Sequence, residues 1–141
     1  MQTTRSRRYS QQRQAILDGL RGLTSHPTAV DLYEMVRTRL PRISLGTVYR
    51  NLELLTEMGA IQRLEVGGPE SRFDGNADHH HHVRCILCGR LDDLCGVPDG
   101  LSDLPAGDGL ANTSGYEILG FQLVFSGICP ECGRLQRDDV N

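Results

Sequence analysis

Two pairs of cysteines are the residues of this 141-residue chain whose type and spacing most directly predict metal chemistry. Cys85 with Cys88 and Cys129 with Cys132 each form a Cys-x-x-Cys pair, followed by a glycine that lets the backbone turn around the sulfurs. Four thiolates at this spacing are typical of a closed, tetrahedral zinc site that stabilises a fold. Cys95 has no partner at metal-binding spacing, and we expect it to be an ordinary buried thiol.

A run of four histidines, His79 to His82, directly precedes the first cysteine pair. Imidazoles combined with carboxylates make a more exchangeable site, which suits iron, manganese or zinc. In a strand, the period of two places His80 and His82 on one face and the other two histidines on the opposite face. Two imidazoles are half of a metal site, so further ligands must come from elsewhere. The candidates are Asp74, Asp78, Asp92 and Asp93 near the run, and His26 in the first half of the chain.

The elements that must position these residues differ between the two halves. In the first half, residues 1–9 have the composition of a disordered basic arm, and three helical patterns follow. The predicted helices begin near Ser10, Thr28 and Ser44 and end near Gly22, Pro41 and Gly59. Their apolar stripes are Ile16, Leu17 and Leu20; Val30, Tyr33, Val36 and Leu40; and Val48, Leu52 and Leu55. Residues 60–66 and 71–74 then alternate as a hairpin, so residues 1–74 are predicted to form a winged helix-turn-helix domain.

The third helix of such a domain enters the major groove of DNA, so its solvent face predicts the base contacts. Subtracting the apolar stripe leaves Thr47, Tyr49, Arg50 and Asn51 exposed. Thr47 and Asn51 can form hydrogen bonds with bases, Tyr49 can contact thymine methyl groups, and Arg50 can bind a guanine or a phosphate. Arg8 and Arg13 are further candidate DNA-binding residues near the N-terminus. The alternative is that these side chains only solvate the helices.

The second half is predicted to be a small α/β domain that depends on zinc for its stability. Residues 75–78 form a short polar hinge, after which residues 79–85, 91–94 and 116–128 have strand patterns. One short helix is expected within residues 101–110. The whole chain is therefore of the α+β class, with a metal-binding domain over residues 79–141.

Charge divides the chain at the same place. Residues 1–75 carry 11 arginines and 8 carboxylates, whereas residues 76–141 carry 4 arginines and 10 carboxylates. This favours a nucleic-acid-binding half joined to a sensing half over an unevenly charged but inert surface. The sequence shows neither a signal peptide nor an apolar stretch of about 20 residues, and its five cysteines fit metal-bound thiolates in a reducing compartment. We therefore expect a cytoplasmic protein without a membrane partner.

His26 lies in the half predicted to bind DNA and is followed by a proline. A histidine in that position is usually a turn residue. If His26 does bind the metal, however, the metal joins the two halves and its occupancy sets their relative orientation, which makes a switch.

Taken together, these segments resemble the ferric uptake regulator family along nearly the whole chain. The matching segments are His26-Pro-Thr-Ala, the run from Ser44 to Leu52, Ser71-Arg-Phe-Asp74, the histidine run into Cys85-x-x-Cys88-Gly, and Cys129-x-x-Cys132. The resemblance implies a homodimeric, metal-dependent transcription factor, usually a repressor, that binds inverted-repeat operators in double-stranded DNA. It implies structural zinc at the four paired cysteines. It also implies a regulatory Fe(II) or Mn(II) site made by His26, Asp74, His80, His82 and Asp93.

Within that family the chain resembles the peroxide-responsive subgroup. Iron-uptake regulators typically have glutamate where Asp74 and Asp93 stand here, and Phe121 takes the place of a histidine that completes a second exchangeable site. No adequate partners for His79 and His81 are evident, so this second site is expected to be incomplete. The resemblance implies that Fe(II) reacts with hydrogen peroxide and that His26 or His80 is oxidised, whereas Mn(II) leaves the protein insensitive.

Three other functions remain open on the sequence alone. An iron- or zinc-responsive uptake regulator of the same family has the same scaffold and differs in which metal restores DNA binding. An enzyme is a second class, because two histidines and a carboxylate on iron resemble the site of non-haem oxygenases. We expect no enzyme and no small-molecule substrate, since five protein ligands leave little room for one. A zinc-stabilised DNA-binding adaptor that senses nothing is the third.

Overall fold

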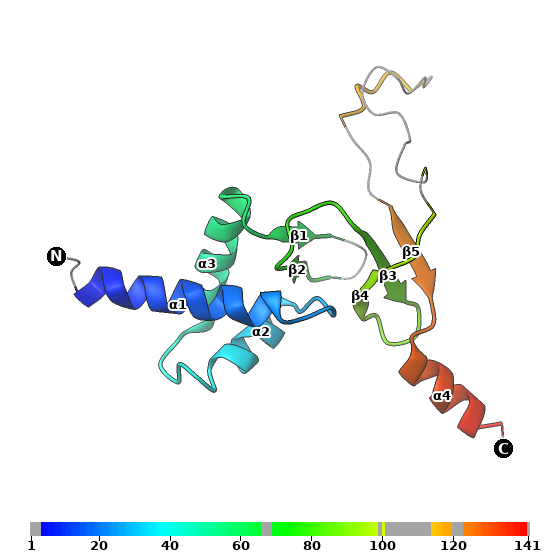
Figure 1. The fold of residues 1–141 in the computed structure, drawn as a ribbon, viewed down its shortest axis with the longest axis horizontal. Helices are drawn as coiled ribbons and strands as arrows, with labels where there is room; N and C mark the ends of the chain where they lie inside the picture. The colour runs from blue at the N-terminus through cyan, green and yellow to red at the C-terminus, as the bar shows by residue number, and fades with distance from the viewer. Residues whose placement is uncertain (1–3, 66–68, 99, 101–113, 120–122, 141) are drawn as a thin grey trace.

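Three helices and a hairpin make up the first half of the computed structural model (Figure 1), which describes residues 4–65, 69–98, 100, 114–119 and 123–140. The helices are α1 (Thr4–Arg21), α2 (Ala29–Val36) and α3 (Leu45–Glu57). The hairpin pairs β1 (Gln62–Leu64) with β2 (Arg72–Asp74) in antiparallel register. This confirms the predicted winged helix-turn-helix order.

Local side-chain bonds start the second and third helices at the predicted residues. The Thr28 hydroxyl accepts the N–H of Asp31, and the Asp31 carboxylate accepts the N–H of Thr28, which makes a capping box at α2. Ser44 accepts the N–H of Thr47 at the start of α3. Each cap satisfies backbone donors that the first helical turn leaves without partners.

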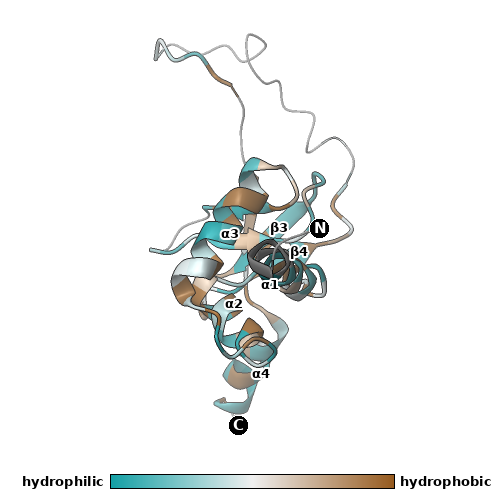
Figure 2. Cartoon of the chain, turned by 90° about the vertical axis from the view of Figure 1, so that its left-hand side faces the viewer, coloured by the Kyte–Doolittle hydropathy of each residue, from teal (hydrophilic) through white to brown (hydrophobic). Residues whose placement is uncertain are grey.

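The apolar faces of these helices form one core. Its almost fully buried side chains include Ile16 and Leu20 of α1, Leu32 of α2, and Val48 and Leu52 of α3. Brown and teal segments alternate along α2 and α3 in Figure 2, as expected for helices that bury one face. The predicted stripe of α2 is partly wrong, because Val30 is exposed and Leu32 takes the core position. That helix also ends at Val36 and does not reach Leu40.

Helix α1 differs from its prediction at its N-terminal end. The helix begins at Thr4, not at Ser10 as predicted. The prediction of a disordered arm over residues 1–9 is therefore wrong for residues 4–9. Arg8 is therefore a helical residue. Arginine and glutamine are good helix formers, and a polar composition alone does not exclude a helix.

The described part of the second half is a three-stranded sheet followed by a helix (Figure 1). Strand β3 (His81–Cys85) lies between β4 (Leu91–Leu94), which is antiparallel to it, and β5 (Val124–Gly127), which is parallel. Of the strand predicted over residues 116–128, only β5 is a strand among the described residues. Helix α4 (Pro130–Asp138) was not predicted, and the helix expected within residues 101–110 lies outside the described residues.

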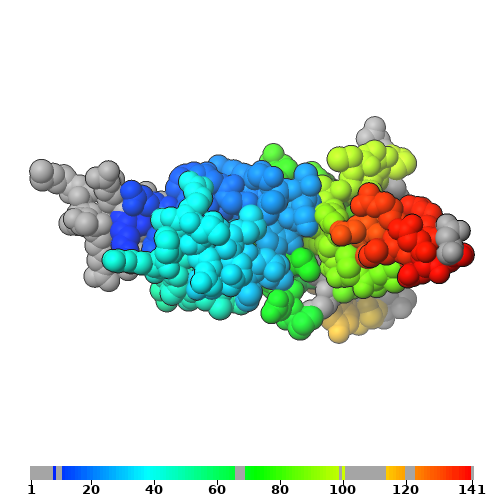
Figure 3. Space-filling view, turned by 90° about the horizontal axis from the view of Figure 1, so that it is seen from below, coloured from blue at the N-terminus to red at the C-terminus, as the bar shows by residue number. Residues whose placement is uncertain are grey.

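Backbone hydrogen bonds join the two halves. The N–H of His26 donates to Leu91 O at 2.9 Å, and the N–H of Asp93 donates to Thr24 O at 3.0 Å, so the loop before α2 pairs with β4. Figure 3 shows the result as two adjoining lobes, one blue to cyan and one yellow-green to red. Among the described helices, none combines the length and apolar character that crossing a membrane requires.

Candidate metal centres and nucleic-acid interface

Two turns and one helix start bring the four paired cysteines together. Cys85 ends β3, Cys88 lies in the turn to β4, and Cys129 and Cys132 lie at the start of α4. Gly89 adopts a φ of 77°, as expected for the glycine after the first pair. Gly133 is helical, so the same expectation is wrong for the second pair. The four residues form what we call the cysteine cluster, in which all four sulfurs lie within 4.8 Å of one another.

Backbone amides point at the sulfurs of this cluster. The N–H of Cys129 donates to the Cys85 sulfur at 3.3 Å, and the N–H of Cys132 donates to the Cys129 sulfur at 3.4 Å. Hydrogen bonds from the backbone N–H groups of Cys88 and Cys129 lower the pKa of Cys85 to about 6. The hydrogen bond to Cys129, together with burial, raises the pKa of Cys132 to about 12. Four sulfurs this close resist joint ionisation unless a cation compensates their charge.

The cysteine cluster fits zinc. Tetrahedral zinc at about 2.3 Å from each sulfur separates neighbouring sulfurs by about 3.8 Å. The Cys88 and Cys129 sulfurs are 3.9 Å apart. All four ligands are thiols, and all come from the second half of the chain, so the site suits a zinc ion that stabilises this half.

The second group of ligands comes from both halves. His26 lies in the loop before α2 and Asp74 ends β2, whereas His80 and His82 lie just before and within β3, and Asp93 lies on β4. One nitrogen or oxygen from each of these five residues lies within 4.8 Å of the others. We call this set the histidine–aspartate cluster. The structure thus brings together all five residues that the family resemblance implied, in one group that spans the two lobes.

Two carboxylate oxygens lie at the centre of this cluster. Asp74 Oδ2 is 2.6 Å from His80 Nε2, 2.9 Å from His82 Nε2 and 3.4 Å from His26 Nε2. Asp93 Oδ1 is 2.7 Å from His26 Nε2, 2.9 Å from His80 Nε2 and 3.6 Å from His82 Nε2. All three imidazoles therefore present the same nitrogen, Nε2, to the same two carboxylates.

Burial and charge act in opposite directions on the ionisation of this cluster. Burial raises the pKa of Asp74, but hydrogen bonds from His82 and the Asn76 N–H and the charges of the nearby histidines outweigh it, so the pKa lies below its usual value. Burial lowers the pKa of His80, but the Asp78 carbonyl and the charges of Asp74 and Asp93 outweigh it, so this pKa is raised. These contacts favour the ionised form of Asp74, so the cluster attracts positive charge.

The histidine–aspartate cluster fits an iron or manganese ion. Three imidazole nitrogens and two carboxylate oxygens are ligands that Fe(II) and Mn(II) accept. Asp74 is 2% exposed and His26 is 1% exposed, and a buried carboxylate requires a cation or strong hydrogen bonds. The harder donors and the mixed origin distinguish this cluster from the four thiols.

The other candidate ligands lie outside the cluster. Asp92 forms a two-point contact with Arg90, with the closest distance 2.7 Å. The ring centroids of His79 and His81 lie 5.6 Å apart. Among the described residues, these two histidines belong to neither of the two clusters. Cys95 is exposed, so the expectation that it is buried is wrong.

One supporting residue was missed in the sequence. Arg72 donates from Nη1 to the His26 carbonyl at 2.9 Å and so fixes the loop that carries His26. Its place two residues before Asp74 in the Arg-Phe-Asp segment is the signal that pointed to it.

Helix α3 exposes part of the predicted DNA-binding face. Tyr49 is 48% exposed, and Arg50 is also exposed, with its guanidinium 3.2 Å from the Thr47 hydroxyl. The prediction that Asn51 is exposed is wrong, because Asn51 is buried and its amide donates to Thr47 O at 2.9 Å. A difference of one position along a helix rotates a side chain by about 100°, which places Asn51 beside the core.

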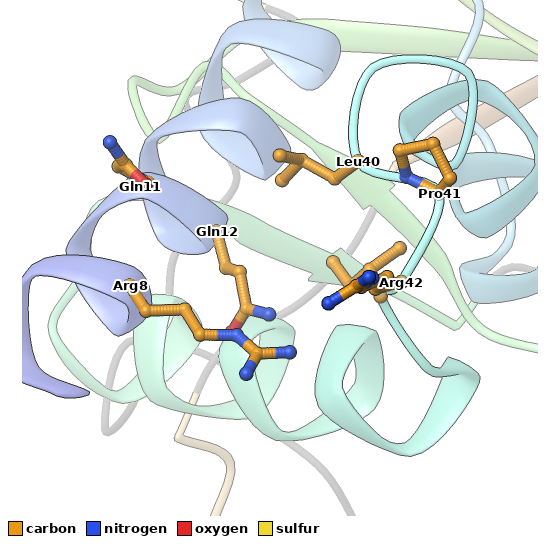
Figure 4. A pocket seen from close by; sticks show the side chains of 7 residues that line it. Arg8, Gln11, Gln12, Leu40, Pro41 and Arg42 are labelled. Carbon is orange, nitrogen blue, oxygen red and sulfur yellow. The ribbon is translucent and has the colours of Figure 1, made fainter. Parts of the chain in front are cut away.

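Further arginines lie on α1 and in the segment before α3. Arg8 and Arg42 line a pocket of about 460 Å³ together with the buried amide of Gln12, and Figure 4 shows these three side chains extending into the same space. Arg13, also a predicted DNA-binding residue, is half-buried and its Nε atom is enclosed. Arg42 was missed in the sequence, although its position two residues before the cap of α3 was a usable signal.

Comparisons with known proteins agree with this architecture. The model of the ferric uptake regulator family matches residues 4–97. The peroxide operon regulator of Bacillus subtilis is 35% identical over 127 residues, which cover 90% of this chain and 85% of that regulator. The peroxide-responsive repressor PerR of Staphylococcus epidermidis is 32% identical, over 89% of this chain and 81% of that repressor. The crystal structure of the Campylobacter jejuni peroxide stress regulator superposes with a TM-score of 0.68 and 28% identity, over 89% of this chain and 91% of that one. The chain belongs to the ferric uptake regulator family.

Proposed function

We propose that this protein is a metal-dependent, DNA-binding transcriptional repressor that senses hydrogen peroxide through Fe(II) in the histidine–aspartate cluster. The observation that carries the proposal is the convergence of five ligands from both halves of the chain on one group. The names of the relatives that cover most of this chain, which refer to peroxide response, support the choice of signal.

A metal in this cluster fixes the arrangement of the two halves. We take residues 1–74 as the DNA-binding domain, residues 75–78 as the hinge and residues 79–141 as the metal-binding and dimerisation domain. His26 and Asp74 belong to the first domain, and the other three ligands belong to the second. Binding one ion to all five therefore stabilises one relative orientation, and loss of the ion releases it.

The DNA-binding surface is proposed to consist of the exposed residues of α3 and the arginines beside it. Tyr49 and Arg50 contact base edges, and Thr47 orients Arg50 through its hydroxyl. Arg8, Arg13 and Arg42 contact the phosphate backbone. The positive balance of charge in this half supports this assignment.

We further propose that the protein acts as a homodimer on inverted-repeat DNA. An inverted repeat in double-stranded DNA matches the two-fold symmetry of a dimer. Strand β5 is the outer strand of the described sheet, and we propose that its outer edge pairs with a second copy.

Access to the histidine–aspartate cluster supports the choice of a small oxidant. The side chains of His80 and Asp93 keep 20% and 26% of their surface exposed, whereas that of His26 keeps 1%. Fe(II) bound here would supply the electron that breaks the O–O bond of hydrogen peroxide, which Mn(II) would not, and the oxygen added to an imidazole would come from the peroxide. His80 lies on the open side and His26 on the closed side, and oxidation of either imidazole removes a ligand that holds the halves together.

The test compares two metals under one challenge. The zinc-containing protein is loaded without oxygen with Fe(II) or with Mn(II), treated with near-stoichiometric peroxide, and assayed for operator binding and by peptide mass spectrometry. The proposal predicts one added oxygen atom on the peptide of His26 or His80, together with loss of DNA binding, in the iron sample alone. Unchanged histidines, with DNA binding that simply follows metal occupancy, would instead identify an iron- or zinc-responsive uptake regulator.

A further inference from the structure

The hinge between the two halves is held by a relay of hydrogen bonds. Asp74 Oδ1 accepts the N–H of Asn76 at 2.9 Å, and Asn76 Oδ1 accepts the N–H of Asp78 at 2.9 Å. The Asp78 carbonyl lies 2.6 Å from His80 Nδ1. Each bond spans two residues, so the relay begins at one ligand of the histidine–aspartate cluster and ends at another.

This relay fixes how both ligands face the cluster. Asp74 uses Oδ1 in the hinge and presents Oδ2 to the histidines. A carbonyl oxygen only accepts hydrogen bonds, so His80 must carry a proton on Nδ1 to bond to Asp78. Neutral His80 then has its lone pair on Nε2, the atom that faces Asp74 and Asp93. Such a bond to the second ring nitrogen sets the orientation and basicity of a metal-binding imidazole.

A side chain from the wing, the hairpin of β1 and β2, adds two hydrogen bonds to this relay. Gln62 lies on β1 directly opposite Asp74 in the hairpin. Its amide nitrogen donates to the Asn76 carbonyl at 2.8 Å and to the Asp78 carbonyl at 3.0 Å. The Asp78 carbonyl thus accepts from His80 on one side and from Gln62 on the other. Gln62 does not belong to the five residues of the histidine–aspartate cluster.

We infer that Gln62 is a positioning residue for the histidine–aspartate cluster and couples it to the wing of the DNA-binding domain. Strand β1 is one of the two strands of that wing, and a shift of β1 moves the Asp78 carbonyl that orients His80. Metal binding and wing position are therefore linked, and by thermodynamic reciprocity operator DNA that holds the wing tightens metal binding. The linkage to DNA rests on the proposed function, whereas the positioning of His80 does not.

The experiment measures Mn(II) affinity of zinc-containing, DNA-free protein by titration with electron paramagnetic resonance. Gln62→Met keeps the length of the side chain and removes both donated bonds, and Gln62→Glu keeps the shape but places a carboxylate against two carbonyls. Gln14→Met is the matched control, since the Gln14 amide donates to Asp18 on the exposed face of α1 and touches neither hinge nor cluster. Gln62 is half-buried and its two hydrogen bonds are exposed to solvent, so neither substitution opens a gap in the core.

Loss of a group that orients a metal ligand typically weakens binding by about 10- to 100-fold. We expect about tenfold weaker Mn(II) binding in Gln62→Met, at least as large a loss in Gln62→Glu, unchanged zinc content, and wild-type affinity in Gln14→Met. Mn(II) affinity within twofold of wild type in both Gln62 variants would overturn the positioning role.

Repeating the titration with operator DNA tests the coupling separately. Operator DNA should tighten Mn(II) binding in the wild type, and this gain should shrink in Gln62→Met. An equal gain in both proteins would overturn the coupling. A wild type in which operator DNA leaves Mn(II) affinity unchanged would contradict the proposed function and the coupling, while the DNA-free affinities would still decide the positioning role of Gln62. Long-range nitrogen-15 spectra of zinc-loaded protein add a readout that stability does not affect, because they report whether His80 keeps its proton on Nδ1.

Discussion

The cysteine cluster and the histidine–aspartate cluster lie within one small protein but differ in which parts of the chain they join. All four cysteines come from residues 85–132, two from the end of β3 and the turn after it and two from the start of α4. The five residues of the other cluster come from both lobes, including one loop and one strand end of the winged helix domain. The first site therefore closes a fold, and the second closes an interface between folds.

The chemistry of the ligands follows the same division. Four thiolates bind zinc tightly and leave no open position, which suits a permanent ion. Imidazoles and carboxylates bind divalent ions with less selectivity, which suits an ion that exchanges. A metal site can act as a sensor when its ligands come from parts of the chain that can separate and when its donors allow the ion to leave.

Replacement of one zinc ligand should unfold the second half. In Cys129→Ser, we expect loss of zinc and of the cooperative unfolding of β3, β4, β5 and α4, because structural zinc contributes about 10–16 kcal/mol in zinc-finger peptides. Zinc content and nuclear magnetic resonance spectra of the two halves would measure this. Cys95→Ser is the control, since Cys95 is exposed and outside the cluster. A folded Cys129→Ser protein would mean that the cysteine cluster is dispensable for the fold.

Replacement of a central ligand in the other cluster should leave the fold intact. Asp74→Asn weakens the charge that faces all three histidines, so we expect Mn(II) affinity to fall by more than about 100-fold, beyond the usual effect of a supporting residue. Zinc content should not change. Asp92→Asn is the matched control because Asp92 is paired with Arg90. If Asp74→Asn lost zinc as well, the two sites would not be independent.

Loss of a base contact should have a smaller effect and leave both metals in place. Arg50→Ala is expected to weaken operator binding by about 1–3 kcal/mol if Arg50 forms two hydrogen bonds to one base. Fluorescence anisotropy at several salt concentrations would distinguish the two kinds of contact. Loss of a phosphate contact would lower the affinity for all sequences and reduce the salt dependence of binding. Arg37→Ala provides a control just after the end of α2, where the arginine contacts Glu34.

The smallest effect is on pH. The pKa of His80 is raised in the metal-free chain, so protonation of His80 stabilises this state below the pKa of the unfolded chain, and this contribution is lost as pH rises through the folded pKa. Metal binding must displace that proton, so Mn(II) affinity should increase with pH by at most about tenfold per unit. Calorimetry in buffers with different ionisation enthalpies measures the released proton. Binding without proton release would contradict the raised pKa.

The sequence predicted which side chains come together in the two clusters better than it predicted the elements that hold them. Cys-x-x-Cys spacing and the histidine run are local signals, and a resemblance to a known family supplied His26 and Asp93. The choice of Asp93 over Asp92 depends on strand register, since Asp93 lies directly opposite His82 and Asp92 opposite Val83. Register is a long-range property that the local pattern does not contain.

Other features were missed for related reasons. Asn51 is polar, yet its amide caps a carbonyl of its own helix and fits beside the core, so polarity alone gave the wrong face. Helix α4 had a local signal that was overlooked, because Cys129 accepts the N–H of Cys132 as a helix cap and Pro130 follows at the first helical position. The pairing of the loop before α2 with β4 joins residues far apart in the sequence and had no local signal.

We propose that the histidine–aspartate cluster, and not the cysteine cluster, controls DNA binding. The most direct measurement is operator binding during a Mn(II) titration of protein that retains zinc but has been stripped of its exchangeable metal by a mild chelator. We expect weak operator binding at the start and tight binding once about one Mn(II) per chain is bound, with constant zinc throughout. Operator binding that is equally tight before and after Mn(II) addition would contradict it.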